Sequence, residues 1–324
     1  MSAAAAGVLR VGTRASVLAT TQSRLVADRL RETLGREVEL VEVSTEGDRS
    51  QAAGTPLQGA ASTGVFVTAL REALLRGEVD VAVHSLKDLP TYPADGITLA
   101  AVPTREDPRD VVVARDGLTL GELPVGSRVG TGSPRRAAQL HALGLGLDVV
   151  GIRGNVDTRI GKVRAGEYDA VILARAGLAR IGRLDEATEV LDPLQMLPAP
   201  GQGALAVECR AGEALAAEVA AVLDDPRARA AVSAERAVLA TLEGGCSAPI
   251  GALAELVEGE DDEELWVRSV ALSPDGALSV RMSAAGDPTD AVGVGTRLAE
   301  EMLADGAGRL ADPQMNTADK VQNA

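Results

Sequence analysis

The sequence predicts an α/β protein built from two α/β domains with mainly parallel sheets and a smaller C-terminal α+β domain. At 324 residues, the chain exceeds the roughly 150 residues of an average domain, so more than one core is expected. Short β-branched runs alternate with longer helical patterns from residue 7 to residue 174. Beyond residue 226, the order changes to a long helix followed by strands and a hairpin signal.

The first domain begins with a βαβαβ pattern. The expected strands are VLRVGTR, EVELVEV and VDVAVHS, and the helices between them are SVLATTQSRLVADRLRETLG and VFVTALREALLRG. Three prolines and GQG then interrupt residues 185 to 203, after which ALAVEC resumes a strand and GEALAAEVAAVL a helix. We expect this strand to return to the first domain, which would comprise residues 7–103 and 204–222.

The second domain restarts the same pattern after the proline-containing crossing AVPTREDPRD. Its expected strands are DVVVAR, SRVGTG, LDVVGI and YDAVILA, with one helix beginning at Pro134 and another after Asn155. We therefore predict a second α/β domain over residues 104–203.

The C-terminal domain is predicted over residues 226–312. A long helix, RARAAVSAERAVLATLEGG, is followed by strands ELWVRSVAL and ALSVRMSAAG, which SPDG joins as a hairpin, and by helix DAVGVGTRLAEEMLADG. The acidic run at 258–264 is expected to be a solvated loop, and the polar residues 313–324 a disordered tail.

Composition excludes several function classes. Hydrophobic residues make up 46% of the chain, which is ordinary for a globular protein. Its net charge of −15 argues against non-specific binding to nucleic acid or to an anionic membrane. Two histidines and two cysteines are too few for a metal site built from these residues. We read no signal peptide and no apolar stretch of roughly 18 residues. The expectation is a cytoplasmic monomer with no metal, membrane or nucleic-acid partner.

Polar and basic residues follow the predicted strands of the first domain. GTRAS supplies Arg14 and Ser16 after one strand, and HSLKD supplies Ser85, Lys87 and Asp88 after another. In open parallel sheets, ligands bind beyond the carboxyl ends of the strands. These residues therefore favour a ligand site at that edge.

GTGSPRR places two cations in the first turn of a helix in the second domain. Ser133 suits the N-cap and Pro134 the first helical position, so Arg135 and Arg136 occupy the next two, with Thr131 just before. Each cation opposes the helix dipole by about 0.3 to 1 kcal/mol, which favours a bound anion over a merely solvated pair.

RGNVDTR repeats this arrangement in milder form, because Asn155 is the expected N-cap and Arg153 and Arg159 flank the turn. Taken alone, these arginines could equally be solvated surface groups. Four such motifs in two α/β domains, within an acidic chain, together predict a cleft for a polycarboxylate or a polyphosphate.

One carboxylate, Asp88, and one thiol, that of Cys246, stand in motifs of their own. Asp88 is either a salt-bridge partner or a proton-transfer group, and neighbouring arginines favour the first role unless the reaction creates a positive charge. Cys246 lies in the glycine-rich LEGGCSAPIG between a helix end and a strand start, where a structural or incidental role is the commoner one. Cys209, in ALAVECR, is predicted to pack in a core.

The ordered motifs GTRAS, HSLKD, REDPRD, GTGSPRR, RGNVDTR, LPAPGQGALAVECR and LEGGCSAPIG resemble those of the porphobilinogen deaminase, or hydroxymethylbilane synthase, family. They extend over residues 12 to 251. The resemblance implies a transferase that condenses four porphobilinogen molecules head-to-tail into the linear tetrapyrrole hydroxymethylbilane, releasing ammonia. It also implies a covalently held dipyrromethane cofactor and, as partners, porphobilinogen and the growing polypyrrole.

The same resemblance implies roles for individual residues. Cys246 would form the thioether to the dipyrromethane, and Asp88 would be the catalytic carboxylate that stabilises an azafulvenium cation. Residues 45–64 would form an active-site lid with Phe66 over the pyrroles, although Phe66 could equally be a core aromatic. The carboxylates of cofactor and substrate would be received by Arg14, Ser16, Ser85, Lys87, Thr131, Ser133, Arg135, Arg136, Arg153, Arg159 and Arg180.

The chain departs from the family pattern near the lid. Many members carry a lysine where this chain has Thr63, before Gly64, so the resemblance does not extend to a basic role for that segment. Gly132 and Pro134 also differ from the usual residues around the arginine pair, but neither change removes a charge.

Two other function classes fit parts of the pattern. Two periplasmic-binding-protein-like α/β domains with an anion site also describe a non-enzymatic solute-binding protein, which would have no need of a cysteine-bearing third domain. A phosphoryl-handling enzyme could use the helix start at Ser133, but the chain has no GxxxxGK[ST] motif.

Overall fold

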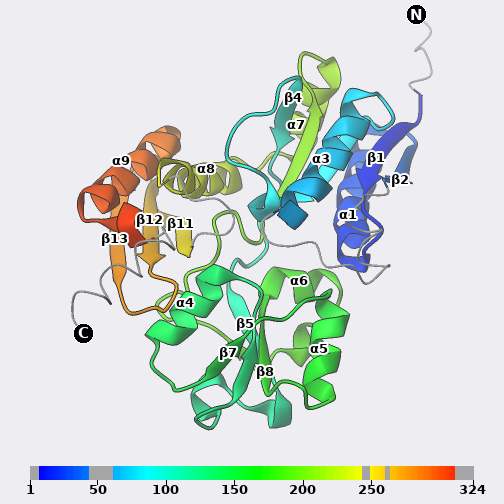
Figure 1. Ribbon diagram of the computed structural model, residues 1–324. Coiled ribbons are helices and arrows are strands. Elements are labelled where there is room, and N and C mark those ends of the chain that lie inside the picture. The colour runs from blue at the N-terminus through cyan, green and yellow to red at the C-terminus, as the bar shows by residue number, and fades with distance from the viewer. Residues whose placement is uncertain (1–6, 44–60, 243–248, 260–262, 311–324) are drawn as a thin grey trace, which may run out of the picture. The chain divides into compact units, whose positions relative to one another are not determined.

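The computed structural model describes residues 7–43, 61–242, 249–259 and 263–310, except for the side chains of 61–66 (Figure 1). The chain divides into two compact units, one of residues 1–106 and 204–229 and the other of residues 107–203 and 230–324. The predicted three-domain division is finer than these two units and stays a prediction.

The first unit is organised by a five-stranded sheet in the order β2-β1-β3-β10-β4. Its strands are β1 (Leu9–Thr13), β2 (Val38–Glu42), β3 (Val81–Ser85), β4 (Ile97–Ala101) and β10 (Leu205–Arg210). β1 pairs in parallel with β2 and β3, whereas β10 is antiparallel to both β3 and β4. After Gly203 the chain thus returns to the first sheet, as its sequence predicts.

Helices cover both faces of this sheet. α1 (Val17–Leu34) and α7 (Ala214–Leu223) pack on one face, where Val26, Leu30 and Val219 join a buried apolar cluster with the strands. α3 (Ala61–Leu75) contributes Leu70 and Leu74 to a second cluster. Because both faces are covered, the inner strands β3 and β10 are buried along almost their whole length, whereas the edge strand β2 keeps exposed glutamates.

The second unit repeats this topology in a sheet of order β7-β6-β8-β5-β9, in which β5 is the antiparallel strand. Its strands are β5 (Asp110–Ala114), β6 (Arg128–Gly130), β7 (Asp148–Val150), β8 (Ala170–Ala174) and β9 (Glu189–Val190). Its helices are α4 (Pro134–Ala142), α5 (Val156–Arg164) and α6 (Arg175–Arg180), with short 3₁₀ turns η2 (Arg115–Gly117), η3 (Leu120–Glu122) and η4 (Leu184–Glu186). α4 begins at Pro134, as expected.

The C-terminal part of this unit is a three-stranded antiparallel sheet with helices packed on it (Figure 1). Its elements are β11 (Ile250–Glu258), β12 (Glu263–Leu272), β13 (Ser279–Gly286), α8 (Pro226–Thr241), η5 (Pro288–Asp290), α9 (Ala291–Ala304) and α10 (Ala307–Leu310). The SPDG turn joins β12 to β13 as predicted.

Three strands are missing from the sequence-based expectation. β11, with sequence IGALAELVE, is rich in alanine, leucine and glutamate, which favour helices in isolation. β4 contains two alanines, and β9 has only two residues. Their strand conformation is imposed by pairing with β12, β10 and β5, which is tertiary context that a local pattern does not contain.

The three-stranded sheet packs directly against the α/β part of the same unit. Ala138 of α4 and Leu197 share a buried cluster with Leu253, Val270 and Leu272 of β11 and β12. The Ala252 amide also donates to the Pro198 carbonyl at 3.0 Å. The helix that carries the arginine pair is therefore fixed to the C-terminal sheet.

Candidate active site

In the first unit, predicted site residues from separate motifs line one small pocket. Arg14 follows β1, while Ser85 ends β3 and Asp88 lies in the 3₁₀ turn η1 (Leu86–Asp88) that follows it. β1 and β3 are parallel neighbours, so their carboxyl ends meet at one edge of the sheet. The pocket has a volume of about 50 Å³ and is lined by Arg14, Ala19, Gln22, Val67, Val83, His84, Ser85 and Asp88.

Hydrogen bonds fix the polar side chains around this pocket. Ser16 caps α1, because its Oγ accepts from the Ala19 amide at 3.3 Å. Gln22, one turn further along α1, donates from Nε2 to Ser85 Oγ at 3.1 Å. Lys87 lies in η1 and is half-buried. Sequence reasoning missed Gln22, whose only signal is its place on the helix that GTRAS begins.

A buried ionic network lies beside the pocket. His84 Nε2 is 3.3 Å from the carboxylate of Glu208 on β10, and that carboxylate also accepts two hydrogen bonds from Arg71 of α3. These contacts lower the pKa of Glu208 to about 2 despite its burial, which by itself would raise the pKa. Sequence reasoning did not select His84, although it stands in the HSLKD motif.

In the second unit, the arginine pair binds a carboxylate of the chain itself. Arg135 Nη2 donates to Asp110 Oδ2 at 2.8 Å, and Arg136 Nη2 donates to Asp110 Oδ1 at 2.7 Å. Asp110 is fully buried, and both arginines are nearly so. The two guanidinium groups hold the pKa of the Asp110 carboxyl far below its usual value.

The anion that accompanies Arg135 and Arg136 is therefore the Asp110 carboxylate, and not a bound ligand as GTGSPRR predicts. Arg135 and Arg136 do occupy the second and third positions of α4, and a negative charge does offset their repulsion from the helix dipole. That charge belongs to Asp110, so the helix start alone does not require a ligand. The sequence signal for Asp110 is an acid at the first position of the buried strand DVVVA, where an unpaired carboxylate would be costly.

A second group of cations lies close to the arginine pair. Asn155 caps α5 by accepting from the Thr158 amide at 2.9 Å, and Arg159 Nε donates to the Gly154 carbonyl at 2.8 Å. Burial, together with the positive charges of Arg136 and Arg153, lowers the pKa of Arg159 to about 10. A crowded cation of this kind favours an anionic ligand, which would relieve the repulsion.

The remaining predicted residues of this unit have mainly backbone contacts. Thr131 is buried and accepts at Oγ1 from the Ser133 amide at 3.2 Å. Ser133 holds the N-cap position of α4, but its side chain makes no capping hydrogen bond. Arg180 Nη2 donates to the Gly203 carbonyl at 2.5 Å, so this arginine also holds the segment that leads into β10.

Several predictions fall outside the described residues. These are Cys246, the side chain of Phe66, and all of the proposed lid except residues 61–64, of which only the helical backbone is described. Cys209 is described: it is fully buried in β10, and burial raises the pKa of its thiol to about 12. Its predicted role in core packing is confirmed.

Within the described part of the chain, no group of three or more His, Cys, Asp and Glu side chains has the arrangement of a metal site. No helix in that part is long and apolar enough to cross a membrane.

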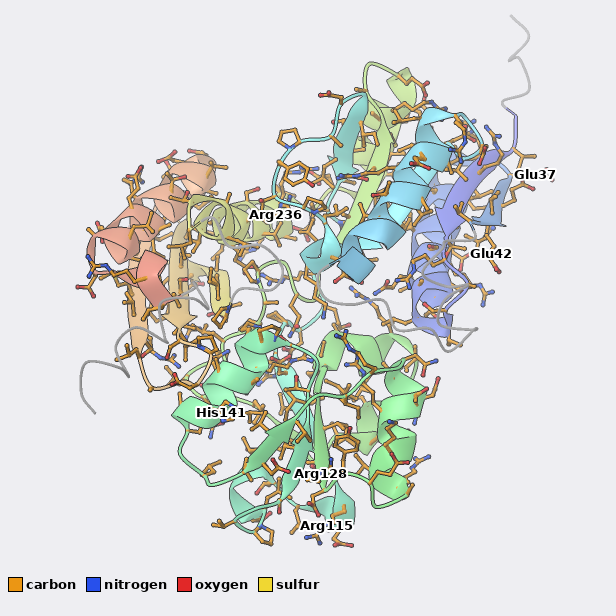
Figure 2. All side chains as sticks on the ribbon, viewed as in Figure 1. Glu37, Glu42, Arg115, Arg128, His141 and Arg236 are labelled. Carbon is orange, nitrogen blue, oxygen red and sulfur yellow. The ribbon has the colours of Figure 1, made fainter. Side chains whose placement is uncertain are left out.

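Not every arginine of the second sheet lies near the arginine pair: Arg128, at the start of β6, and Arg115, after the antiparallel β5, lie at the opposite end of the sheet (Figure 2).

The chemistry available at these two places is similar. In each unit, cationic and hydrogen-bonding groups gather at the carboxyl ends of parallel strands, as a site for carboxylates requires. The first unit adds the Asp88 carboxylate within its pocket. A carboxylate there is suited to stabilising a positive charge that develops on a bound substrate.

Comparison with known proteins gives consistent matches over nearly the whole chain. A family model described as porphobilinogen deaminase, dipyromethane cofactor binding domain, matches residues 9–218, and one described as porphobilinogen deaminase, C-terminal domain, matches residues 229–304. The chain is 58% identical to a porphobilinogen deaminase of Mycobacterium tuberculosis (strain ATCC 25618 / H37Rv) over 94% of its own length and 98% of the relative's. A porphobilinogen deaminase of Mycobacterium marinum is 56% identical over 94% and 96% of the two chains.

Among solved structures, an ABC transporter periplasmic substrate-binding protein from Coxiella burnetii is similar with a TM-score of 0.43 and 14% identity. That similarity covers 70% of this chain and 96% of the other.

Proposed function

The chain belongs to the porphobilinogen deaminase family, and from this premise we propose which of its residues carry the family's reaction. It is a transferase, hydroxymethylbilane synthase, which condenses four porphobilinogen molecules head-to-tail into hydroxymethylbilane with release of ammonia. The observation that carries the residue assignment is the meeting of Arg14, Ser85 and Asp88 in one pocket, because two separate motifs converge there.

We propose Asp88 as the catalytic carboxylate. When ammonia leaves a bound porphobilinogen, positive charge develops on the pyrrole and its exocyclic carbon. An ionised carboxylate beside that carbon lowers the energy of the cation. Arg14 lines the same pocket, where its guanidinium can hold a carboxylate of the substrate. Charge stabilisation therefore suits this position better than proton donation.

We propose that the predicted cationic and hydroxyl groups bind the acetate and propionate groups of the substrate and of the growing chain. In the first unit these are Arg14, Ser16, Ser85 and Lys87. The second unit would contribute Thr131, Ser133, Arg135, Arg136, Arg153, Arg159 and Arg180. The lowered pKa of Arg159 supports this role most directly, because a half-buried cation beside two others gains most from a bound carboxylate.

The cofactor follows from the family, and its attachment is our proposal. The matching domain of the family binds a dipyrromethane, whose acid groups fit the excess of cations around Arg136, Arg153 and Arg159. We propose Cys246 as the residue bonded to it through a thioether. Cys209, the other cysteine of the chain, is fully buried with a pKa near 12, so its thiol is unsuited to the bond. When bound, the dipyrromethane supplies the pyrrole carbon to which the first substrate is joined.

Intact-protein mass tests this assignment. We expect active protein to exceed its sequence mass by two pyrrole units, Cys246→Ser to have the unmodified mass and no activity, and the control Cys209→Ser to keep the added mass. An unmodified mass in active protein would refute the covalent cofactor. The added mass persisting in Cys246→Ser would move the attachment to another residue.

The remaining assignments stay predictions. They are Phe66 as a cover over the pyrroles, residues 45–64 as a lid, a monomer in the cytoplasm, the absence of nucleic-acid and membrane partners, and the three-domain division. The alternative of a non-enzymatic solute-binding protein is not favoured, because both family matches are to a deaminase.

A further inference from the structure

Asp110 joins two consecutive arginines through one carboxylate. Its Oδ2 accepts from Arg135 and its Oδ1 from Arg136, at 2.8 and 2.7 Å, and the Gln202 amide also donates to Oδ1 at 2.7 Å. Gln202 in turn donates to the Pro108 carbonyl at 2.7 Å. The carboxylate is thus held from three directions and has no exposed surface.

The far edge of each guanidinium is held as well. Arg136 Nη1 donates to the Ile172 carbonyl of β8 at 3.0 Å, and Arg135 Nη1 donates to the Leu197 carbonyl. Both Nε atoms, in contrast, are buried and have no hydrogen-bond partner within the described residues. Each side chain is therefore fixed at both terminal nitrogens while one charged donor is left unused.

A buried ionic network of this kind stabilises a core less effectively than apolar packing does. Burying three charges costs desolvation that apolar residues of similar volume would avoid, and such replacements are often neutral or stabilising. A fixed orientation is what the charged network adds. The orientation of the Arg136 guanidinium affects the neighbouring turn. Its positive charge is one of the two that lower the pKa of Arg159 there.

We propose that Asp110 is a positioning residue for the anion site: its carboxylate fixes the guanidinium groups of Arg135 and Arg136 so that they meet the substrate and cofactor carboxylates already oriented. This inference rests on the proposed role of the two arginines. Asp110 has no exposed surface through which it could touch substrate or cofactor. Gln202, from the segment that leads into β10, holds Asp110 in turn.

Removing the charge of Asp110 does not simply make the site more positive. Burial and the charge of Arg136 lower the pKa of Arg135, and the Asp110 carboxylate offsets part of that lowering. Without that carboxylate, two adjacent buried cations repel each other, so at least one guanidinium must leave its position. Its movement weakens a preorganised site for carboxylates.

The test compares Asp110→Asn with Asp80→Asn in the full-length holoenzyme. Asp80 is a matched control, since its carboxylate also accepts from two arginines, Arg10 at 2.8 Å and Arg210 at 3.2 Å, but it lies before β3, at the end of that strand away from Ser85. We expect Asp110→Asn to raise KM for porphobilinogen at least about tenfold, with kcat per loaded enzyme changed less than about threefold. Intact mass should show a smaller fraction of protein carrying the cofactor. Asp80→Asn should lower the thermal midpoint but leave KM and cofactor content unchanged.

Two further variants separate the possible failures. Arg136→Gln should raise KM, and the effects of Asp110→Asn and Arg136→Gln should be non-additive in the double variant. If Arg136→Gln leaves KM and cofactor content unchanged, the arginine role is wrong. If Arg136→Gln is impaired while Asp110→Asn matches Asp80→Asn, only the positioning role is wrong. Should Asp110→Asn not fold, Gln202→Leu replaces it, and a KM within about twofold of wild type would overturn the proposal.

Discussion

Arg71 of α3 donates two hydrogen bonds to the buried carboxylate of Glu208 on β10, from Nε at 3.0 Å and from Nη2 at 2.6 Å. His84 Nε2 approaches the same carboxylate at 3.3 Å from the adjacent strand. α3 is thereby joined to the strand that returns to the first sheet. The contact also makes the stability of the protein depend on pH, because it lowers the pKa of Glu208 to about 2.

We predict that the stabilisation from Glu208 is complete above its ordinary pKa of 4.5 and is lost as pH falls toward 2. Between these values the unfolded chain binds the proton more readily than the folded one. The shift corresponds to about 3 kcal/mol. Urea unfolding at several pH values should show Glu208→Gln less stable than wild type at pH 7, with the difference shrinking in acid. A difference that does not vary with pH would contradict the assignment.

Asp88→Asn should fold normally but turn over slowly. The amide keeps the size of the side chain while removing the charge that stabilises the cationic substrate, so we expect kcat to fall at least about a hundredfold. The thermal midpoint should stay near that of wild type, because Asp88 is only half-buried. Steady-state kinetics with porphobilinogen provides the measurement.

Asp95→Asn is the matched control for that experiment, since Asp95 lies seven residues further along, is exposed, and does not line the pocket. It makes the same change in charge and should leave kcat unaltered. Near-normal turnover in Asp88→Asn, or an equal loss in both variants, would remove Asp88 from catalysis.

Arg159→Gln should weaken substrate binding without destabilising the protein much. Arg159 is a half-buried cation whose pKa is lowered to about 10 by burial, Arg136 and Arg153, so its charge opposes folding when no anion is bound. We expect KM to rise about tenfold and the thermal midpoint to stay level or rise slightly. The control is Arg128→Gln, at the opposite end of the same sheet (Figure 2). Equal KM values for the two variants would count against an anion site at Arg159.

The fold could be predicted from the sequence where local pattern and tertiary environment agree. The helix starts at Pro134 and Asn155 are encoded by residues within one turn, so each was predicted at its correct position. β11 was missed because its alanine, leucine and glutamate favour a helix until β12 supplies hydrogen bonds. The Ser133 N-cap was predicted by position, but its side chain does not make the capping hydrogen bond.

The site shows the same limit more sharply. Basic residues after strands are visible in the sequence, because the carboxyl edge of a parallel sheet gathers whatever follows each strand. Their partners are not visible: Asp110 precedes Arg135 by 25 residues and Gln202 follows it by 67, and only the sheet order brings them together. For this reason the sequence predicted that an anion accompanies the arginine pair but assigned it to a ligand.

The turn between β12 and β13 offers a test of how the C-terminal sheet is fixed to α4. Gly276 has φ of +70° and lies against the helix, where an added Cβ would come within 2.4 Å of the Ala138 carbonyl oxygen and 2.6 Å of the Ala142 amide nitrogen. Gly182, in the same unit, has φ of +68° with open space around it.

Gly182→Ala should therefore cost only the left-handed backbone strain, about 1 kcal/mol. Gly276→Ala must in addition displace the turn from backbone atoms that cannot yield, so we expect a loss of about 3 kcal/mol or more. At roughly 2 to 4 °C per kcal/mol for a protein of this size, thermal unfolding distinguishes the two variants. Equal midpoints would mean that the turn does not hold α4, and the buried cluster of Ala138, Leu197 and Val270 would then be the main attachment.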